Sequence, residues 1–196
     1  VHDDEIVIYT EEHGLWNNFI HTVLKKEDGF LIGSKKGINR LQGGIIEKLY
    51  QNYSSLFLDI MNMYETADGS LYCGSWGYGA VVLKNGIAST ISKKNGLLTD
   101  HIFTIFEDKH GQIYFGQDGG MSIYRPGVMH VYDERLMQDP DVWSLLQLSN
   151  GDFLLGATSG LERFDGDRFY NIPLPGELKR SGAYSMAELE NGDVLI

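Results

Sequence analysis

A glycine-based repeat of about forty residues is the feature that most constrains how this 196-residue chain can fold. Five short segments end in Asp-Gly, His-Gly or Asn-Gly, and each is followed by a run rich in apolar residues. Their glycines are Gly29, Gly69, Gly111, Gly151 and Gly192, which lie 40, 42, 40 and 41 residues apart. Self-similarity at such a period indicates repeated supersecondary units that bury their apolar faces against one another.

Each repeat reads as four antiparallel strands. In the ten residues that end at each glycine, such as "IFTIFEDKHG", the first, second, fourth and fifth positions are mostly apolar, which is typical of a strand covered on both faces. The third position is always small and polar: Thr22, Asn62, Thr104, Ser144 and Ser185. We expect small residues there because the inner strands of neighbouring units converge. The Xaa-Gly pair predicts a tight hairpin, and further glycine turns lead to three more strands, such as "QIYFG", "MSIYR" and "VMHVY".

Four-stranded units at this period, arranged radially, make a β-propeller. We therefore predict an all-β fold, a β-propeller of four-stranded antiparallel blades, over the whole chain. The predicted units are 17–52, 57–94, 101–135 and 141–174, with a partial unit at 183–196. Residues 5–10, "EIVIYT", match the fourth strand of a preceding blade. No stretch shows the 3.6-residue period of a helical solenoid over three turns.

The ends of the chain leave two arrangements open. A five-bladed ring could close by pairing both termini, but one of its blades would lack a third strand. We favour the second arrangement, a segment of a larger propeller whose other blades are absent from this sequence. Two open ends expose apolar faces and strand edges, so an isolated segment is expected to aggregate or to form a homodimer.

Composition excludes several classes of partner. The net charge is −11 and no cluster of Lys and Arg occurs, which argues against binding to nucleic acid or to anionic membranes. No apolar run approaches the roughly 18 residues that span a bilayer, so this segment is not expected to insert into a membrane. The single cysteine, Cys73, cannot form a disulfide within the chain and reads as a buried, inert thiol.

The repeat resembles a known family. The segment "NGLLTDHIFTIFEDKHGQIYFGQDGGMSIYRPG", residues 95–127, is similar to the two-component regulator propeller repeat, as are "HGLWNNFIHTVLKKEDGFLIG" and "LYCGSWGYGAVVL". The chain departs from the family pattern in the loop after Gly-Leu, where Trp16 and Leu98 replace the usual proline. It also departs in the second strand, where Leu31, Tyr72, Tyr114 and Leu154 replace the usual tryptophan, and in the last unit, which lacks two strands.

The resemblance implies a function that the residues alone do not. Propellers of that family are the extracytoplasmic sensors of membrane-anchored hybrid histidine kinases, and many respond to oligosaccharides. By resemblance, this chain is expected to be the periplasmic or extracellular, non-enzymatic ligand-sensing part of a two-component signalling protein. Its expected partners are a small ligand, for which an oligosaccharide is one candidate, and the remaining blades and signalling domains of the same protein, with histidine kinase activity elsewhere in it.

The candidate ligand-binding residues lie in the longer loops. In a four-stranded meander, loops between the second and third strands share a face with the links between units, and loops on a rigid scaffold commonly carry binding. The candidates on this face are Trp76, Tyr78, Trp16, Asn18, Asp100, His101, Gln117 and Asp118. Aromatic rings can stack on sugars while amides and carboxylates bind hydroxyl groups. Two alternatives stay open: blade-to-blade packing for the aromatic residues, and turn chemistry for the polar ones.

Catalysis has little support in the sequence. The six histidines do not recur in register, no two of them have metal-ligand spacing, and no nucleophile elbow occurs, so neither a catalytic residue nor a cofactor or metal is expected. Two alternative functions remain beside sensing. One is a propeller enzyme, such as a polysaccharide lyase or a streptogramin-lyase-like enzyme, which would need His and acidic residues converging at the channel mouth. The other is a protein–protein interaction scaffold, which would show a flat apolar rim.

Overall fold

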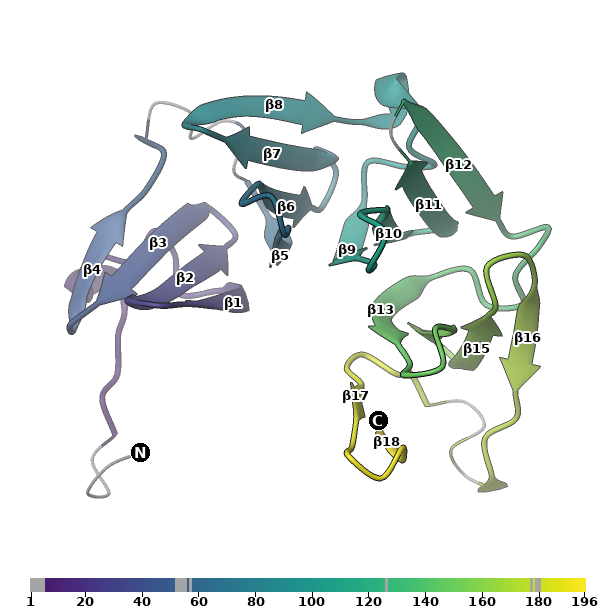
Figure 1. The fold of residues 1–196 in the computed structure, drawn as a ribbon. Helices are drawn as coiled ribbons and strands as arrows, with labels where there is room; N and C mark the ends of the chain where they lie inside the picture. The colour runs from purple at the N-terminus through teal and green to yellow at the C-terminus, as the bar shows by residue number, and fades with distance from the viewer. Residues whose placement is uncertain (1–5, 52–55, 57, 126, 177, 179–180) are drawn as a thin grey trace.

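The structure is an open arc of small antiparallel sheets (Figure 1). It is a computed structural model that describes residues 6–51, 56, 58–125, 127–176, 178 and 181–196. The described residues form four four-stranded sheets and one two-stranded sheet. The predicted all-β propeller fold is therefore confirmed. Among the same residues, no helix has the length and apolar character that crossing a membrane would require.

Each four-stranded sheet is a simple meander in which strands adjacent in sequence pair with one another. The first blade contains β1 (Ile20–Lys26), β2 (Gly29–Ser34), β3 (Gly37–Gln42) and β4 (Ile45–Lys48). The second contains β5 (Ile60–Glu65), β6 (Leu71–Ser75), β7 (Ala80–Lys84) and β8 (Ile87–Ile91). The third contains β9 (Ile102–Glu107), β10 (Ile113–Gln117), β11 (Gly120–Arg125) and β12 (Val128–Asp133). The fourth contains β13 (Val142–Gln147), β14 (Phe153–Ala157), β15 (Gly160–Phe164) and β16 (Phe169–Ile172), and β17 (Ala187–Glu188) pairs with β18 (Val194–Leu195).

The first strand of each blade lies nearest the centre of the arc and the fourth lies at its outer rim (Figure 1). The arc does not close, because no described strand joins the first blade to β17 and β18. A ring of five blades is therefore not what the structure shows. The strand predicted over residues 5–10 is also absent from its described part, Ile6–Thr10. A fourth strand needs the third strand of its own blade beside it, and none of the described strands takes that place.

The hydrophobic core lies between blades rather than within them. One cluster joins β2 and β3 to the second blade through Leu31, Ile38, Ile60 and Met63. A second cluster joins the second and third blades, and a third cluster joins the third and fourth. Each blade therefore hides its apolar faces only against its neighbours, as stacked repeats do.

Close approach between blades depends on a glycine near the end of each second strand: Gly33, Gly74, Gly116 and Gly156. We call these the wall glycines. The first residue of the next inner strand packs directly over each of them. A Cβ on Gly74 would lie 2.6 Å from Ile102 Cγ2, and one on Gly116 would lie 2.6 Å from the Val142 carbonyl oxygen. No side chain fits between these two surfaces.

The small third-position residues pair with the wall glycines and help to join the blades. Thr104 pairs with Gly116 and Ser144 with Gly156, each beside a register shift in the inner strand. The Ser144 hydroxyl donates to the carbonyl oxygen of Ala183 at 2.7 Å, and Asn62 Oδ1 accepts the Ile105 amide proton at 3.1 Å. Both bonds cross from one blade to the next. Small size and a hydrogen-bonding group are therefore both used at this position.

The outer flank of the first blade has no neighbour among the described residues. Val23 in β1 is 57% exposed, whereas its equivalents Met63 and Ile105 are 4% and 3% exposed. Phe30 and Ile45 in the same blade are also exposed. This flank has the apolar character of a blade interface, as the prediction of a segment of a larger propeller requires.

Replacing a wall glycine should destabilise the fold. In Gly116→Ala the new Cβ would lie 2.5 Å from Thr104 Cγ2, so the blades must separate slightly. Overpacking of this kind costs about 1–3 kcal/mol, which corresponds to a melting temperature lower by roughly 2–10 °C. Thermal unfolding followed by circular dichroism measures the shift. Gly160→Ala is the matched control, because a Cβ there meets no atom within 4 Å. Equal shifts for the two variants would contradict the steric account.

The Cys73 thiol should be inert in the folded chain. Its side chain is fully buried between the first two blades, and burial raises the pKa of the thiol well above its ordinary value. Because the thiolate is the reactive form, a thiol reagent such as Ellman's reagent at pH 8 should react slowly with the native chain and fully once guanidinium unfolds it. Rapid stoichiometric reaction without denaturant would show that the interface between these blades opens readily.

Candidate functional site

On one face of the arc, the hairpin between the second and third strands of a blade interlocks with the link that enters the next blade. In the second blade this hairpin is 76–79, and the link that follows the blade ends at His101. The amides of Gly77 and Gly79 both donate to the Asp100 carbonyl oxygen, at 3.0 and 2.9 Å, and Trp76 forms an antiparallel bridge with His101. The structure thus brings together three of the predicted site residues, Trp76, Asp100 and His101.

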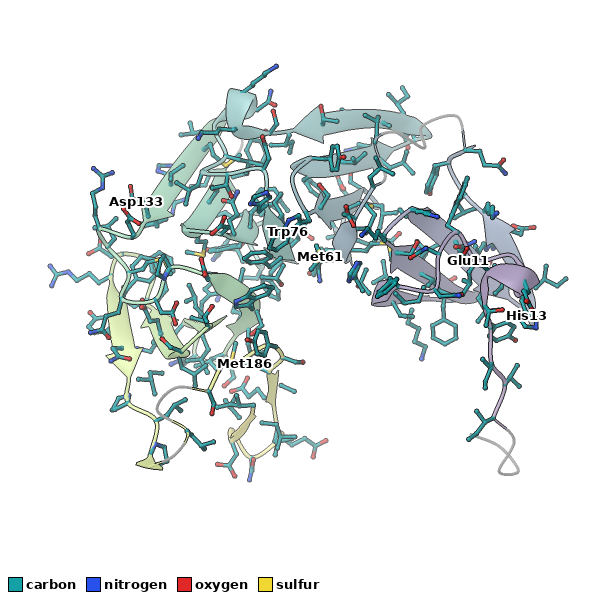
Figure 2. All side chains as sticks on the ribbon, turned by 180° about the vertical axis from the view of Figure 1, so that it is seen from behind. Glu11, His13, Met61, Trp76, Asp133 and Met186 are labelled. Atoms are coloured by element: carbon teal, nitrogen blue, oxygen red, sulfur yellow. The ribbon has the colours of Figure 1, made fainter. Side chains whose placement is uncertain are left out.

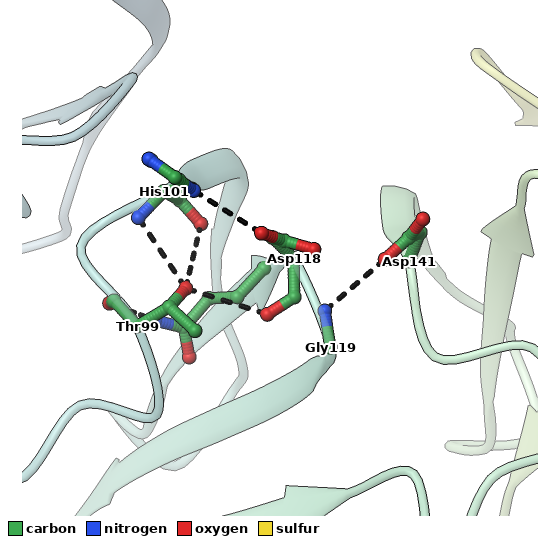
Figure 3. Close-up of polar contacts among 6 residues, drawn as sticks. Thr99, His101, Asp118, Gly119 and Asp141 are labelled. Carbon is green, nitrogen blue, oxygen red and sulfur yellow. Dashed lines mark hydrogen bonds and ion pairs between the residues drawn. The ribbon is translucent and has the colours of Figure 1, made fainter.

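In the third blade, the corresponding hairpin contacts both the link before the blade, at His101, and the link that follows it, at Asp141 (Figure 3). The Asp118 amide donates to the His101 carbonyl oxygen at 3.3 Å, and the Asp118 carboxylate lies 3.2 Å from His101 Nδ1. The Gly119 amide donates to Asp141 at 3.1 Å. Asp118 and His101 are both partly exposed, so this polar pair stands beside Trp76 at the same rim of the blades.

The inner strands carry a continuous row of rings that begins at this pair. Trp76 stacks on His101 with centroids 4.9 Å apart and also contacts Phe103 at 5.3 Å. Phe103 stacks on Trp143 at 4.0 Å, and Trp143 meets the edge of Tyr184 at 5.5 Å. We call these five residues the aromatic row. It passes from the second blade across the third and fourth to the beginning of the fifth, and Trp76 and Met61 lie on the inner side of the arc (Figure 2).

Three members of the aromatic row were not predicted as site residues. Phe103 and Trp143 occupy the second position of β9 and β13, where the first two blades have His21 and Met61. Tyr184 holds the equivalent place in the sequence of the fifth repeat, just before β17. This aligned column was the signal that could have found them. Trp76 and Tyr184 keep much of their surface exposed, at 45% and 62%, while Phe103 is buried between its neighbours. The row therefore offers flat apolar surface chiefly at its two ends.

Two predicted residues do not belong to this surface. Tyr78 is exposed, but none of the ring contacts among the described residues joins it to the aromatic row. Gln117 is fully buried. Its amide donates to the Thr99 carbonyl oxygen at 2.7 Å and its side-chain oxygen accepts the Ser122 hydroxyl at 2.5 Å. In this structure the hydrogen bonds of Gln117 serve the loop, and its side chain is not exposed on the rim.

Asn18 and Asp100 have a structural task in their links. Each follows a short 3₁₀ turn, η1 (Glu11–His13) or η3 (Lys93–Asn95). Asn18 Oδ1 accepts the Glu11 amide proton at 2.8 Å, and Asp100 Oδ1 accepts the Lys93 amide proton at 2.7 Å. These side chains occupy equivalent places and satisfy amides at the start of the turn that the turn itself leaves free. The open alternative of turn chemistry is what the structure shows for both.

Trp16 is likewise a packing residue. Its ring lies against Gly37, and Lys48 Nζ sits 4.7 Å from the ring centroid. These contacts place it against the third and fourth strands of the first blade rather than on the aromatic row. Its indole nitrogen is buried, and none of the described residues forms a hydrogen bond with it.

The rim suits binding better than catalysis. Flat rings with polar groups beside them can stack on one face of a ligand and bind its edge. The Thr99 hydroxyl accepts the His101 amide proton at 3.3 Å and lies 3.3 Å from the Asp118 carbonyl oxygen, so it serves the backbone of the loop. Within the described part of the chain, no three His, Cys, Asp or Glu residues are grouped as metal ligands.

Comparison with known proteins identifies the fold. No family model and no curated protein matches the sequence. Among solved structures, the chain is similar to the extracellular domain of BT3049 from B. thetaiotaomicron, a protein described as a hybrid two-component system. The TM-score is 0.75 and the sequence identity is 15%, and the match covers 93% of this chain and 26% of that one. The fold is that of a β-propeller. Virginiamycin B lyase from Staphylococcus aureus (TM-score 0.67, 12% identity, 90% and 62% covered) and the WD40 β-propeller domain of Doa1 (0.64, 12%, 89% and 59%) are similar in the same way.

Each of these propellers extends well beyond the part that this chain matches. The chain spans about a quarter of the BT3049 extracellular domain and about three fifths of the lyase and of the Doa1 domain. At such identities the likeness concerns the fold alone.

Removing the Asp100 carboxylate should lower stability. Asp100→Ala leaves the Lys93 amide without its acceptor, a loss comparable to that of a helix N-cap, so about 0.5–2 kcal/mol of stability should disappear. Chemical denaturation monitored by tryptophan fluorescence measures this loss. Asp100→Asn is the matched control, because the first blade uses Asn18 at the same place. If Asp100→Asn were as unstable as Asp100→Ala, a role for the charge itself would replace the capping role.

Proposed function

We propose that this chain is part of a ligand-sensing propeller of a two-component signalling protein, exposed on the periplasmic or extracellular side of the membrane and not itself enzymatic. The likeness in fold to the extracellular domains of BT3049 and BT4673, two proteins described as hybrid two-component systems, supports the proposal. The repeat motifs in the sequence resemble the two-component regulator propeller repeat. Fold alone does not determine function, so the site must supply the argument.

The aromatic row is the observation that carries the proposal. Trp76 presents 45% of its surface at the rim of the second blade, and the ring of His101 supports it from one side. Asp118 and His101 stand beside it as a polar pair. A flat apolar surface with acceptors and donors at its edge fits a pyranose ring, whose axial C–H groups stack while its hydroxyl groups form hydrogen bonds. The proposed ligand is therefore an oligosaccharide.

Binding at the row can be linked to signalling because the row crosses blade boundaries. Trp76 comes from the second blade, Phe103 from the third and Trp143 from the fourth. A ligand shifts an equilibrium between arrangements only through a difference in affinity for them. A ligand spanning these blades would favour one spacing of the inner strands. This change in spacing would pass to the signalling domains of the same protein through the remaining blades and a homodimer contact.

A lyase is the second candidate. Propeller lyases that act on streptogramins share the fold, and one similar structure is a catalytically inactive virginiamycin B lyase with quinupristin. The His101–Asp118 pair at the rim is the observation in this chain that favours it, since a carboxylate beside an imidazole can orient it for proton transfer. Release of product from a streptogramin B or a polysaccharide, lost in His101→Ala, would support this candidate over sensing.

Truncating Trp76 should weaken oligosaccharide binding. A glycan array followed by calorimetry on the hits measures the affinity, and Trp76→Ala should weaken it by about tenfold or more, since tenfold corresponds to roughly 1.4 kcal/mol and buried aromatic anchors commonly contribute that much. Trp76→Phe should retain most of the affinity. Phe30→Ala is the matched control, because Phe30 is similarly exposed but lies in the first blade and is not part of the aromatic row. Binding that is unaffected by Trp76→Ala would exclude the row as the sugar site.

A further inference from the structure

In the first and third blades, a side chain from the preceding link packs into a small space beside the start of the third strand. We call this space the slot. In the first blade, the Trp16 amide donates to Asn39 Oδ1 in β3 at 2.8 Å, and the Trp16 ring covers Gly37. In the third blade, the Leu98 amide donates to the Ser122 hydroxyl in β11 at 3.1 Å, and Leu98 Cδ2 would lie 2.7 Å from a Cβ on Gly120. The slot is thus a repeated feature, bounded by a glycine at the start of the third strand and a polar residue two positions later.

The fourth blade has the slot but nothing that fills it. The Gln138 amide donates to Glu162 Oε1 at 2.6 Å, which makes Gln138 the equivalent of Trp16 and Leu98. Gly160 takes the place of Gly37, yet a Cβ on Gly160 would meet no atom within 4 Å. A cavity of about 390 Å³ lies here instead.

One carboxylate oxygen in this cavity has no hydrogen-bond partner in the part of the chain that the structure describes. Glu162 is 3% exposed and lines the cavity. Its Oε1 accepts the amide protons of Gln138 and Asp139, at 2.6 and 2.8 Å, and no hydrogen bond to its Oε2 exists among the described residues. The equivalent residues in the other slots, Asn39 and Ser122, are neutral.

The walls of the cavity combine this acid with apolar surface. Leu161, Ile172, Pro173 and Leu174 supply apolar groups, and Asn171, which pairs with Glu162 across β15 and β16, supplies an amide. Asp139 also lines the cavity, but its carboxylate is bound by the amide and hydroxyl of Ser159. Burial raises the pKa of Glu162, while the two amide donors act in the opposite direction. A buried acid with one oxygen free favours a ligand that brings a positive charge or an N–H donor.

We propose that the fourth-blade cavity binds an organic cation, a primary ammonium group carried on a flat apolar body. The apolar body occupies the slot beside Gly160, as the Trp16 ring does beside Gly37, and the ammonium group lies at Glu162 Oε2. This site lies against β15 and β16, apart from the aromatic row on the inner strands, and it does not depend on the proposed sensing of sugars.

Tryptamine tests the proposal because it joins an indole to a primary amine. Calorimetric titration of the chain with tryptamine should show saturable one-to-one binding, and tryptophol, which carries a hydroxyl group in place of the amine, should bind at least about tenfold more weakly. Glu162→Gln keeps the Oε1 acceptor for the two amides but removes the charge, and it should weaken tryptamine binding by about tenfold or more at an unchanged melting temperature.

A second variant tests the slot itself. Gln138→Trp gives the fourth blade the side chain that fills the first, so it should abolish tryptamine binding and leave the melting temperature unchanged or higher. Tyr170→Ala, on the same outer strand but not among the residues that line the cavity, is the control and should bind tryptamine normally.

Three results would overturn the proposal. One is the absence of saturable tryptamine binding, and another is binding that Gln138→Trp does not change. The third is binding that appears only after Lys179→Ala and Arg180→Ala, two cations outside the described residues, since the chain itself would then supply the charge for Glu162.

Discussion

Side-by-side packing of the blades at the wall glycines is the contact on which the rest of the structure depends. The carbonyl oxygen of Val142 would lie only 2.6 Å from a Cβ on Gly116, and Ile102 Cγ2 would lie 2.6 Å from a Cβ on Gly74. The apolar clusters lie between blades, so no single blade can bury its own faces. If the inner strands stood farther apart, the clusters would open and the hydrogen bonds that cross from blade to blade, such as Ser144 to Ala183, would be lost.

The same convergence produces the aromatic row. Phe103 and Trp143 occupy the second position of successive inner strands, and only closely packed blades bring them to a 4.0 Å stacking distance. The interlocked loops add Trp76, because its hairpin is held by the amides that donate to the Asp100 carbonyl oxygen. The stacking of the repeats therefore sets the position of the candidate binding surface, and residues that differ between repeats set its side chains.

The fold could be predicted from the sequence because its causes are local and repeated. The Xaa-Gly pair and the apolar segment before it each appear five times, and the spacing of about forty residues recurs four times, so a chance match in one copy has little weight. The roles of the loop residues were harder to predict from the sequence. Asn18, Asp100 and Gln117 look like ligand-binding groups in the sequence, but a polar side chain beside a turn can equally form hydrogen bonds with the backbone. Both roles use the same residue types, so the sequence does not distinguish them. Phe103 and Trp143 were missed because both faces of the inner strands are apolar, so the pattern does not say which face meets the channel.

Differences between repeats are where function can arise in such a fold, since everything the repeats share is needed for packing. The slot beside the third strand shows this most clearly. Trp16 and Leu98 fill it in two blades, and in the fourth the scaffold of Gly160, Glu162 and the Gln138 amide is kept while the filling side chain is lost. An unfilled slot costs packing energy, and a buried carboxylate with a free oxygen costs solvation energy. Both costs fall on the same few atoms. A ligand that is apolar at one end and positively charged at the other would offset them together, whereas mere loss of the packing residue accounts for the space but not for the acid.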